Sequence, residues 1–285
     1  MNSKILQIQN VKDKTTYNPT IPFKDKGTTY MGVRVESLES ELDSRTYFAH
    51  NLRDGSWEIN DSLPSFPLQD PAYMKIGNEL YIAGVKVQNT TNGVLWNQEF
   101  YRGDSIKNLE HFFSGPQGMK DIRLVDLKDR IGVFTRPRGK IGGLGKIGYL
   151  EIGRIDELQK LSETDWYSAQ LIDGLFEDST WGGVNQALKL PDETIGVIGH
   201  KAHKTEYNSV LKKYYYAISF IFNPVTKIVL DCRIIAKRKD FPNSPSKRTP
   251  ELSDIIFPAG IDEKYILYCG LSDYCIGVKK IENPF

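Results

Sequence analysis

Short apolar runs alternate with polar turns along most of the chain. The clearest case lies between Tyr73 and Ile82, where two apolar runs flank the dipeptide Gly77-Asn78. Apolar runs on both sides of such a pair are typical of a β-hairpin. Similar pairs of runs recur at 30–36 with 46–49, 122–125 with 131–134, 187–188 with 194–198, and 255–257 with 265–268. The pattern therefore predicts an all-β fold built from five hairpins.

Each predicted hairpin carries polar residues at one end. These ends are His50-Asn51, Lys86, Arg136 with Arg138, His200 with Lys201, and Ser272-Asp273. Radial repetition of hairpins would bring such ends together around one axis. We therefore expect residues 1–285 to form a single five-bladed β-propeller with the active site in its central funnel. A β-sandwich with similar hairpins is the alternative. Residues 1–27 are expected to contribute a strand that pairs with the last blade and closes the ring.

Composition narrows the class of protein. The 285 residues carry a net charge of +1, which argues against general nucleic-acid binding. No apolar run approaches the roughly 20 residues that cross a bilayer, and the first residues lack the pattern of a signal peptide. The three cysteines form neither a disulfide framework nor a zinc pattern. A cytoplasmic protein without membrane association is expected.

Asp70 is the first candidate for chemistry. It stands directly before Pro71, at the start of the clearest hairpin. Proline fixes its own φ and favours an extended conformation at the residue before it. A carboxylate held in this way at a strand end is a candidate catalytic group. The alternative is an Asx turn that only starts the hairpin.

Positive charge gathers in two later segments. Residues 135–146 combine two arginines and two lysines with several glycines, a composition suited to an anion but not a Walker A loop. His200 and His203 have a spacing that two metal ligands could use. The neighbouring lysines disfavour a cation, so no metal is expected and a histidine-lysine pair facing an anion is the more coherent interpretation.

Several motifs, in chain order, resemble those of the mannoside phosphorylases of glycoside hydrolase family 130. Residues 69–72 resemble the Glu-Asp-Pro-Arg motif that carries the general acid of that family. Lys120-Asp121, followed by Arg136-Pro137, resembles a pair in the third blade where the family binds phosphate. Residues 198–200 resemble a strand that ends in histidine. Residues 255–278 resemble the C-terminal signature, with Tyr-x-Gly-x-x-Asp followed by Ile-Gly-Val.

The chain also departs from that family, because Gln69 replaces the acid of the motif and Ala72 replaces its arginine. In size and pattern it is closer to the β-1,2-mannosyltransferase/phosphorylases of glycosyltransferase family 108, formerly a domain of unknown function.

This resemblance implies an inverting and reversible phosphorolysis of β-1,2-linked manno-oligosaccharides that forms α-mannose 1-phosphate. Asp70 would give a proton to the leaving oxygen, directly or through a sugar hydroxyl, while phosphate attacks the opposite face. An inverting reaction needs one acid and a nucleophile on the far face, and cationic donors can hold a phosphate nucleophile. Inorganic phosphate is then a co-substrate, no cofactor is needed, and a nucleotide-sugar donor is a further option.

The residues expected to bind phosphate are Lys86, Lys120, Arg136, His200 and Lys201. Those expected around the sugar hydroxyls are Arg34, Glu36, Asn51, Asp121, Asn185, Gln186, Asp254 and Asp273, with Trp181 as a surface on which a sugar could stack. Two alternatives stay open. One is an inverting β-mannosidase on the same fold, with Glu36, Glu41 or Asp121 activating water. The other is a carbohydrate-binding propeller without catalytic activity.

Overall fold

The computed structural model describes residues 3–91 and 93–285, and β-strands dominate it as predicted. The first strands are β1 (Ser3–Ile5), β2 (Ile8–Gln9), β3 (Thr15–Tyr17), β4 (Phe23–Asp25), β5 (Thr28–Glu36), β6 (Arg45–Asn51), β7 (Trp57–Ile59), β8 (Gln69–Ile76), β9 (Glu79–Thr90), β10 (Gly93–Gly103) and β11 (Glu110–Ser114). The later strands are β12 (Arg123–Asp126), β13 (Ile131–Thr135), β14 (Gly148–Ile152), β15 (Gln170–Leu171), β16 (Trp181–Lys189), β17 (Ile195–Tyr207), β18 (Val210–Phe222), β19 (Val229–Ala236), β20 (Asp254–Ile261), β21 (Ile266–Leu271) and β22 (Cys275–Lys280). Short helical turns are η1 (Ile106–Asn108), α1 (Gly139–Gly142), η2 (Ile155–Lys160), α2 (Glu163–Tyr167) and η3 (Arg238–Asp240).

Hydrogen bonds join the strands of the described residues into four sheets. Strands β8–β11 form one antiparallel meander and β12–β15 form another. The largest sheet holds two further meanders, β16–β19 and β20–β22 with β1, which are linked by a short parallel pairing of Tyr214 with Asp254 and Tyr215 with Ile255. The last sheet contains β2–β7. The strands thus fall into five meanders, which are antiparallel except where β2 pairs parallel with β7.

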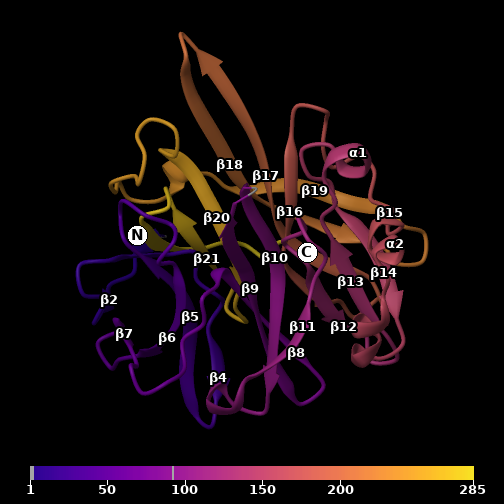
Figure 1. The fold of residues 1–285 in the computed structure, drawn as a ribbon, viewed down its shortest axis with the longest axis horizontal. Coiled ribbons are helices and arrows are strands. Elements are labelled where there is room, and N and C mark those ends of the chain that lie inside the picture. The colour runs from indigo at the N-terminus through magenta and orange to yellow at the C-terminus, as the bar shows by residue number, and fades with distance from the viewer. Residues whose placement is uncertain (1–2, 92) are drawn as a thin grey trace.

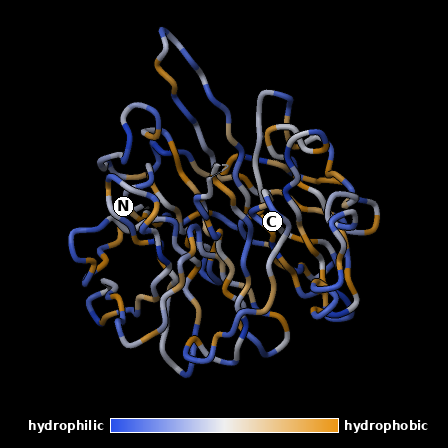
Figure 2. Tube along the Cα trace, viewed as in Figure 1, coloured by the Kyte–Doolittle hydropathy of each residue, from blue (hydrophilic) through white to orange (hydrophobic). Residues whose placement is uncertain are grey.

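The predicted hairpins are present as β5–β6, β8–β9, β12–β13, β16–β17 and β20–β21. The predicted N-terminal closing strand is also confirmed, because β1 pairs antiparallel with β22 from Ser3 opposite Lys279 to Ile5 opposite Gly277. The longest hairpin, β17–β18, projects beyond the rest of the molecule (Figure 1). Polar segments lie mainly in loops and at hairpin tips, and apolar stretches lie mainly within the strands (Figure 2).

The first meander begins earlier than the hydrophobic pattern predicts. Its first strand is β3 together with β4, which pair with the two ends of β5. Residues 30–36, expected to be the first strand of the meander, therefore belong to the second. The pattern misleads here because Pro19 and Pro22 interrupt the apolar run between β3 and β4. A proline has no backbone N–H for the ladder, so the pairing breaks and the strand is divided in two.

The core of the described residues is divided into five hydrophobic clusters, and each lies between two meanders. The members that show this are Phe23 and Ile82 for the first and second meanders, Tyr81 and Val133 for the second and third, Phe134 and Phe220 for the third and fourth, Ile198 and Leu267 for the fourth and fifth, and Met31 and Ile276 for the fifth and first. Apolar burial, at roughly 25 cal/mol per Å², therefore holds each meander to both of its neighbours. The first strands also pack in series, β8 on β12, β12 on β16 and β16 on β20, and β3 contacts β21 and β22.

Candidate active site

Three polar residues occupy matching positions at the beginning of the first three meanders. Asn18 follows β3, Asp70 lies in β8, and Asp121 precedes β12, and their φ angles are 44°, 49° and 60°. Few residues adopt this left-handed conformation, and Asn and Asp are enriched among those that do. At Asp70 the pairing of β8 with β9 shifts between Gln69 and Ala72, which is a β-bulge. The extended conformation expected for Asp70 before Pro71 is therefore wrong.

The Asp70 carboxylate is 8% exposed. Its Oδ1 accepts hydrogen bonds from Asn18 Nδ2 at 2.7 Å and from Arg34 Nη1 at 2.9 Å. Burial alone would raise the pKa of Asp70, but the charges of Arg34 and Lys120 and these hydrogen bonds outweigh it and hold the pKa below its usual value. The group is therefore ionised at neutral pH.

Asn18 packs directly on the last meander. A Cβ atom at Gly270 of β21 would lie 1.8 Å from Asn18 Oδ1, so only glycine leaves room for this contact. Asn18-Pro19 and Asp70-Pro71 are both a short polar residue followed by proline. This shared pattern could have identified Asn18 as a site residue.

Arg34 and Glu36 lie side by side with Asp70 but are buried in a closed network. Arg34 donates from Nε and Nη2 to Glu36 Oε2 at 2.9 and 2.7 Å. Glu36 Oε1 accepts from the Tyr17 hydroxyl and from the Lys247 ammonium. Glu36 is fully buried with both oxygens occupied, so it supports Arg34 and is not placed to bind a sugar hydroxyl.

A second cluster of polar groups surrounds Gly183. Arg136 Nη1 lies 3.3 Å from Asp121 Oδ2, and Arg136 Nε donates to the Gly182 carbonyl at 2.5 Å. A Cβ atom at Gly183 would meet Arg136, His200 and Asp121 at 3.0–3.1 Å. Glycine at this position therefore lets an arginine, a histidine and a carboxylate converge.

His200 is a neutral member of this cluster. Its Nδ1 donates to Asn185 Oδ1 at 2.8 Å, which leaves Nε2 as an acceptor. Burial lowers the pKa of His200 to about 3. The negative charge of Asp121 opposes this shift, and the positive charges of Arg136, Lys120 and Arg123 add to it. Binding of phosphate by His200 stays a prediction, with the ring as a neutral partner. Asn185, at the bulge in β16, orients the ring.

Lys120 lies between the two groups. It is half-buried and forms no hydrogen bond or ion pair with the described residues. Burial would raise the pKa of Asp121, but the charges of Arg136 and then of Lys120 outweigh it and lower that pKa to about 2. The charge of Lys120 also lowers the pKa of Asp70. Lys120 is therefore an unpaired cation beside two ionised carboxylates.

Asp273, in the turn between β21 and β22, differs from both of these carboxylates. Burial raises the pKa of Asp273 to about 6, and the negative charges of Asp70, Glu41 and Glu36 add to the effect while Arg34 opposes it. Two neighbouring carboxyl groups with pKa values shifted in opposite directions are a feature of sites that transfer protons.

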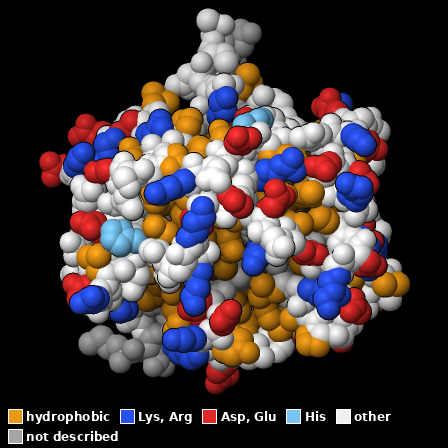
Figure 3. Space-filling view, turned by 90° about the horizontal axis from the view of Figure 1, so that it is seen from below, with side chains coloured by type: hydrophobic (Ala, Val, Ile, Leu, Met, Phe, Trp, Pro, Cys, Tyr) orange, Lys and Arg blue, Asp and Glu red, His pale blue; other side chains and the backbone are white. Residues whose placement is uncertain are grey.

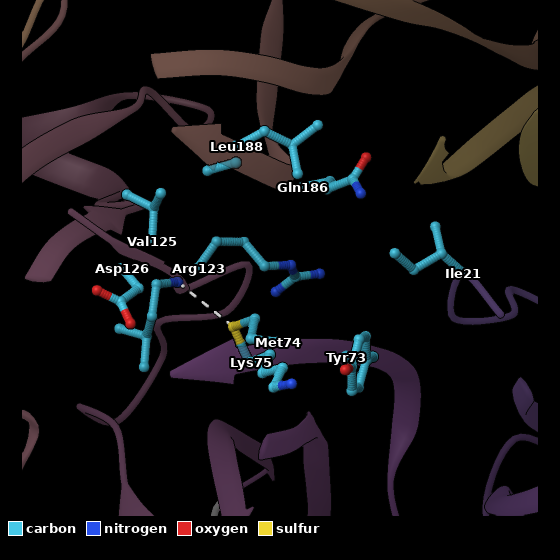
Figure 4. Close-up of a pocket in the computed structure, with 11 residues that line it drawn as sticks. Ile21, Tyr73, Met74, Lys75, Arg123, Val125, Asp126, Gln186 and Leu188 are labelled. Carbon is cyan, nitrogen blue, oxygen red and sulfur yellow. Dashed lines mark hydrogen bonds between the residues drawn. The ribbon is translucent and has the colours of Figure 1, made fainter. Parts of the chain in front are cut away.

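Arg123 is a buried cation near Asp121 and Asp70. It is 2% exposed and donates to the Asn185 and Ile122 carbonyl oxygens at 2.9 and 3.0 Å. Further along the same first strands lies a cavity of about 180 Å³, into which the Arg123 side chain points (Figure 4). Gln186 lines this cavity, but its amide is bound at both ends to the backbone of Ile261, at 3.0 and 2.8 Å. Gln186 therefore braces two strands and has no group left for a sugar.

Other predicted residues lie outside both clusters. Asn51 is exposed at the end of β6 opposite to the Arg34 pairing, a consequence of the misplaced first strand. Lys201 follows His200 on the strand and so faces the other side, where its charge acts on Cys232. Asp254 pairs with Lys212 at 2.6 Å. Lys86 lies opposite Asn97 on β10 and has no ion pair with any residue that the structure describes.

Trp181 is not a free stacking surface. It is buried, and its indole N–H donates to the Tyr215 hydroxyl at 3.2 Å. Tyr215 in turn stacks on His200, with ring centroids 5.8 Å apart. Tyr215, Tyr17, Arg123 and Lys247 are site residues that sequence reasoning missed, since nothing in their local sequence separates them from core or loop residues.

On the face drawn in Figure 3, Lys and Arg side chains are interspersed with Asp and Glu around apolar side chains, so this face carries no single basic patch. Residues 3–91 and 93–285 contain no group of three potential His, Cys, Asp or Glu ligands for a metal ion. Within the same residues, none of the helices has the length and apolar character needed to cross a membrane.

Comparisons with other proteins agree with one another. Residues 1–285 match the family described as "Protein of unknown function (DUF1861)". The structure is similar to MPT-4, a mannose phosphorylase from Leishmania mexicana in complex with phosphate ion, with 31% identity, a TM-score of 0.91, and coverage of 100% of this chain and 89% of that one. It is also similar to MPT-1, a GDP-Man-dependent mannosyltransferase from the same organism, with 30% identity, a TM-score of 0.90, and coverage of 100% and 90%.

More distant likeness concerns the fold alone. A GH93 α-L-arabinofuranosidase from Fusarium graminearum is 11% identical, with a TM-score of 0.57 and coverage of 100% of this chain and 85% of that one. Glycoside hydrolases of this kind have propeller-type folds. No curated protein has a significantly similar sequence.

Proposed function

The chain belongs to the DUF1861 family, and we propose that it is a mannoside phosphorylase that interconverts β-1,2-linked manno-oligosaccharides and α-mannose 1-phosphate with inversion. One observation carries the proposal. The charge of the unpaired Lys120 acts both on a buried carboxylate, Asp70, and on Asp121, which is the ion-pair partner of Arg136. An acid–base group next to a cationic anion site is what an inverting phosphorolysis requires.

The Arg136 cluster is suited to phosphate. Arg136 Nη2 has no hydrogen bond with the described residues, and neither has Lys120, so both could donate to phosphate oxygens. Asn185 Nδ2 is buried without a partner, so a phosphate oxygen could accept its hydrogen bond. The neutral His200 would offer Nε2 to the single proton of a hydrogen phosphate. The similarity to a mannose phosphorylase in complex with phosphate supports this assignment.

Asp70 is proposed as the proton-transferring group. Its Oδ2 accepts no hydrogen bond from the described residues, although Oδ1 accepts two. In synthesis, ionised Asp70 takes the acceptor hydroxyl proton, directly or through a sugar hydroxyl, while the acceptor oxygen bonds to C1 and the C1–phosphate bond breaks. In phosphorolysis, phosphate bonds to C1, the glycosidic bond breaks, and the protonated form of Asp70 gives its proton to the leaving oxygen.

The same residues disfavour a hydrolase. An inverting glycosidase needs a second carboxylate that activates water. Asp121 is paired with Arg136 and Glu36 is fully occupied, so neither is available as a base. Glu41 lies at the exposed rim, where it pairs with Arg248.

We also propose that the five meanders are the five blades of one propeller domain. The five clusters between neighbouring meanders support this architecture, because the last one joins the fifth meander to the first. The ends of the first strands, with Asn18, Asp70, Asp121 and Gly183, would then surround one funnel.

The deciding experiment is an assay of synthesis. The protein is incubated with α-mannose 1-phosphate and mannose, and phosphate release and oligosaccharide formation are followed together. We expect phosphate release matched by β-linked products that disappear again when excess phosphate is added. Absence of both, with β-mannobiose hydrolysed in phosphate-free buffer, would overturn the proposal in favour of a glycosidase.

Transfer from GDP-mannose is the second candidate. It is favoured by the similarity to MPT-1, whose fold and coverage match almost as well. The same acceptor and the same Asp70 would serve, with a nucleoside diphosphate as the leaving group. Adding GDP-mannose in place of mannose 1-phosphate distinguishes the two, since GDP release with product formation identifies the transferase.

A further inference from the structure

The segment 241–253 connects η3 to β20 and lies against the first meander. Its backbone is anchored where Lys247 N donates to the Ser272 carbonyl at 3.1 Å. From there two neighbouring side chains reach residues 36–41. Lys247 contacts Glu36 and the Ser40 carbonyl, and Arg248 pairs with Glu41 at 3.4 Å. The two contacts differ sharply in environment.

The Lys247 side chain is 4% exposed, whereas those of Arg248 and Glu41 are 53% and 45% exposed. An exposed ion pair contributes little, because water and salt screen it. A buried ammonium must be paired with a carboxylate, and removal of one partner leaves an uncompensated charge. Of these two cations, Lys247 is therefore the one whose charge acts strongly on its carboxylate partner.

Glu36 connects Lys247 to Arg34. Its Oε1 is held by Lys247 and Tyr17, and its Oε2 accepts from Arg34 Nε at 2.9 Å and Nη2 at 2.7 Å. The one remaining terminal nitrogen of Arg34, Nη1, donates to Asp70 Oδ1 at 2.9 Å. A continuous chain of charged contacts thus runs from Lys247 to Asp70.

We propose that Lys247 is a positioning residue that acts on Asp70 through Glu36 and Arg34, although it does not touch the substrate. Two cations, Lys247 and Arg34, alternate with two carboxylates, Glu36 and Asp70. With Lys247 present, two cations serve two carboxylates, because Lys247 and Arg34 share Glu36 while Arg34 Nη1 serves Asp70. Without Lys247, Arg34 faces two carboxylates, and Asp70 binds a proton more readily.

Other charged groups that face these carboxylates come from several elements. Asp70 is faced by Lys120 before β12, by Arg123 in β12 and by Asp273 after β21, and Glu36 is faced by Tyr17 in β3. None of them changes when Lys247 alone is replaced. A change in the titration of Asp70 would therefore report the loss of the Lys247 charge.

The catalytic consequence rests on the proposed function, but the titration does not, so the test has two readouts. The Asp70 carboxyl is followed by ¹³C NMR against pH, with its signal identified by its loss in Asp70→Asn. The acidic limb of the pH profile is measured in the synthesis assay. The variants are Lys247→Met, Lys247→Arg and, as the matched control on the adjacent exposed pair, Arg248→Met.

We expect Lys247→Met to move the Asp70 midpoint, and the acidic limb of kcat, upward by roughly half a pH unit or more. KM for mannose 1-phosphate should change less than about twofold, since binding groups are intact. Lys247→Arg should restore both readouts, and Arg248→Met should leave both as in the wild type. If the enzyme is inactive, failure concerns the proposed function alone, and the NMR midpoint still decides.

An unchanged Asp70 midpoint in folded Lys247→Met would overturn the proposal and leave Lys247 a structural residue. If Lys247→Met does not fold, Lys247→Gln keeps a hydrogen-bond donor for Glu36 without the charge. The same upward shift is then expected, and its absence would be equally decisive.

Discussion

The two halves of the candidate site are built from similar residues but are completed to different degrees. The Asp70 cluster consists of Asn18, Arg34, Glu36, Asp70 and Lys247, and the Arg136 cluster consists of Lys120, Asp121, Arg136, Asn185 and His200. In the Asp70 cluster every charged group has a partner, and Asn18 Oδ1 is the one buried polar atom among the described members without a hydrogen bond.

In the Arg136 cluster, Asn185 Nδ2 is buried without a hydrogen bond, Asp121 Oδ2 has the ion pair with Arg136 and no hydrogen bond, and Lys120 has neither a hydrogen bond nor an ion pair with the described residues. A buried polar atom without a partner costs about 1–3 kcal/mol. On the proposed function, a bound phosphate would supply the missing partners. The comparison therefore separates a framework that orients Asp70 from a cluster with groups left to bind an anion.

The sharpest test of this division is Asp70→Asn. The amide keeps the shape and can still accept from Asn18 and Arg34, but it cannot take or return a proton. We expect synthesis and phosphorolysis to fall together by about 10²–10⁴-fold, with binding of the oligosaccharide nearly unchanged. Turnover numbers and a direct binding measurement check this. An activity within threefold of the wild type would remove Asp70 from the mechanism.

The Arg136 cluster is tested by Lys120→Met, which removes a cation without leaving a buried partner behind. We expect the phosphate KM at pH 7 to rise about 10–100-fold, because a charge-assisted hydrogen bond contributes about 1.5–3 kcal/mol. The oligosaccharide KM should change far less. Lys201→Met is the matched control, since Lys201 faces the other side of β17 and should leave both constants within twofold. Equal changes in both constants for Lys120→Met would contradict a role in phosphate binding.

The neutral state of His200 predicts a pH-dependent stability. Between its ordinary pKa of 6.5 and the lowered value of about 3, the unfolded chain binds a proton that the folded protein excludes. Stability therefore falls as the pH falls below 6.5, by up to about 1.4 kcal/mol per pH unit from this group. Urea unfolding at pH 7 and pH 5 should show a smaller loss in His200→Gln than in the wild type. A difference between the two proteins that is independent of pH would show that folding does not lower the pKa of His200.

The smallest effect is expected for Asn51→Ala. Asn51 is exposed at the far end of β6, so both kinetic constants and the unfolding midpoint should match the wild type within experimental error. A loss of activity above threefold would contradict this prediction. It would show that the end of β6 that carries Asn51 contacts the substrate, although it lies away from both clusters.

The sequence alone was sufficient for the hairpins, because periodicity is a local property. The resemblance of short motifs singled out Asp70, Lys120, Asp121 and Arg136, and the structure brings their charges within reach of one another, while their roles stay predictions. It failed at Asn51, since two prolines hid the first strand and shifted the count of strands in that meander. It also misjudged Gln186, whose amide pairs with the Ile261 backbone across two meanders. That contact joins residues 75 positions apart, and no local pattern encodes it.

Charge states were the least accessible to sequence reasoning. The ionisation of His200, Asp70 and Asp273 depends on burial and on neighbours from other meanders. Lys247 lies 211 positions from Glu36, in a proline-rich segment that gives no sign of a buried ammonium. These features appear only when the strands are assembled.

The pairing of β1 with β22 has a consequence for the order of events during synthesis. Residues 3–5 are synthesised well before their partners at 277–279. Strand β1 therefore has no partner until β22 of the last meander, which carries Asp273 and Gly270, has been made. Pairings this distant in sequence slow folding, and the unpaired edge of β1 stays open to other chains in the meantime. Nascent copies of this protein should therefore depend on spacing between ribosomes, or on chaperones, more than its compact final form suggests.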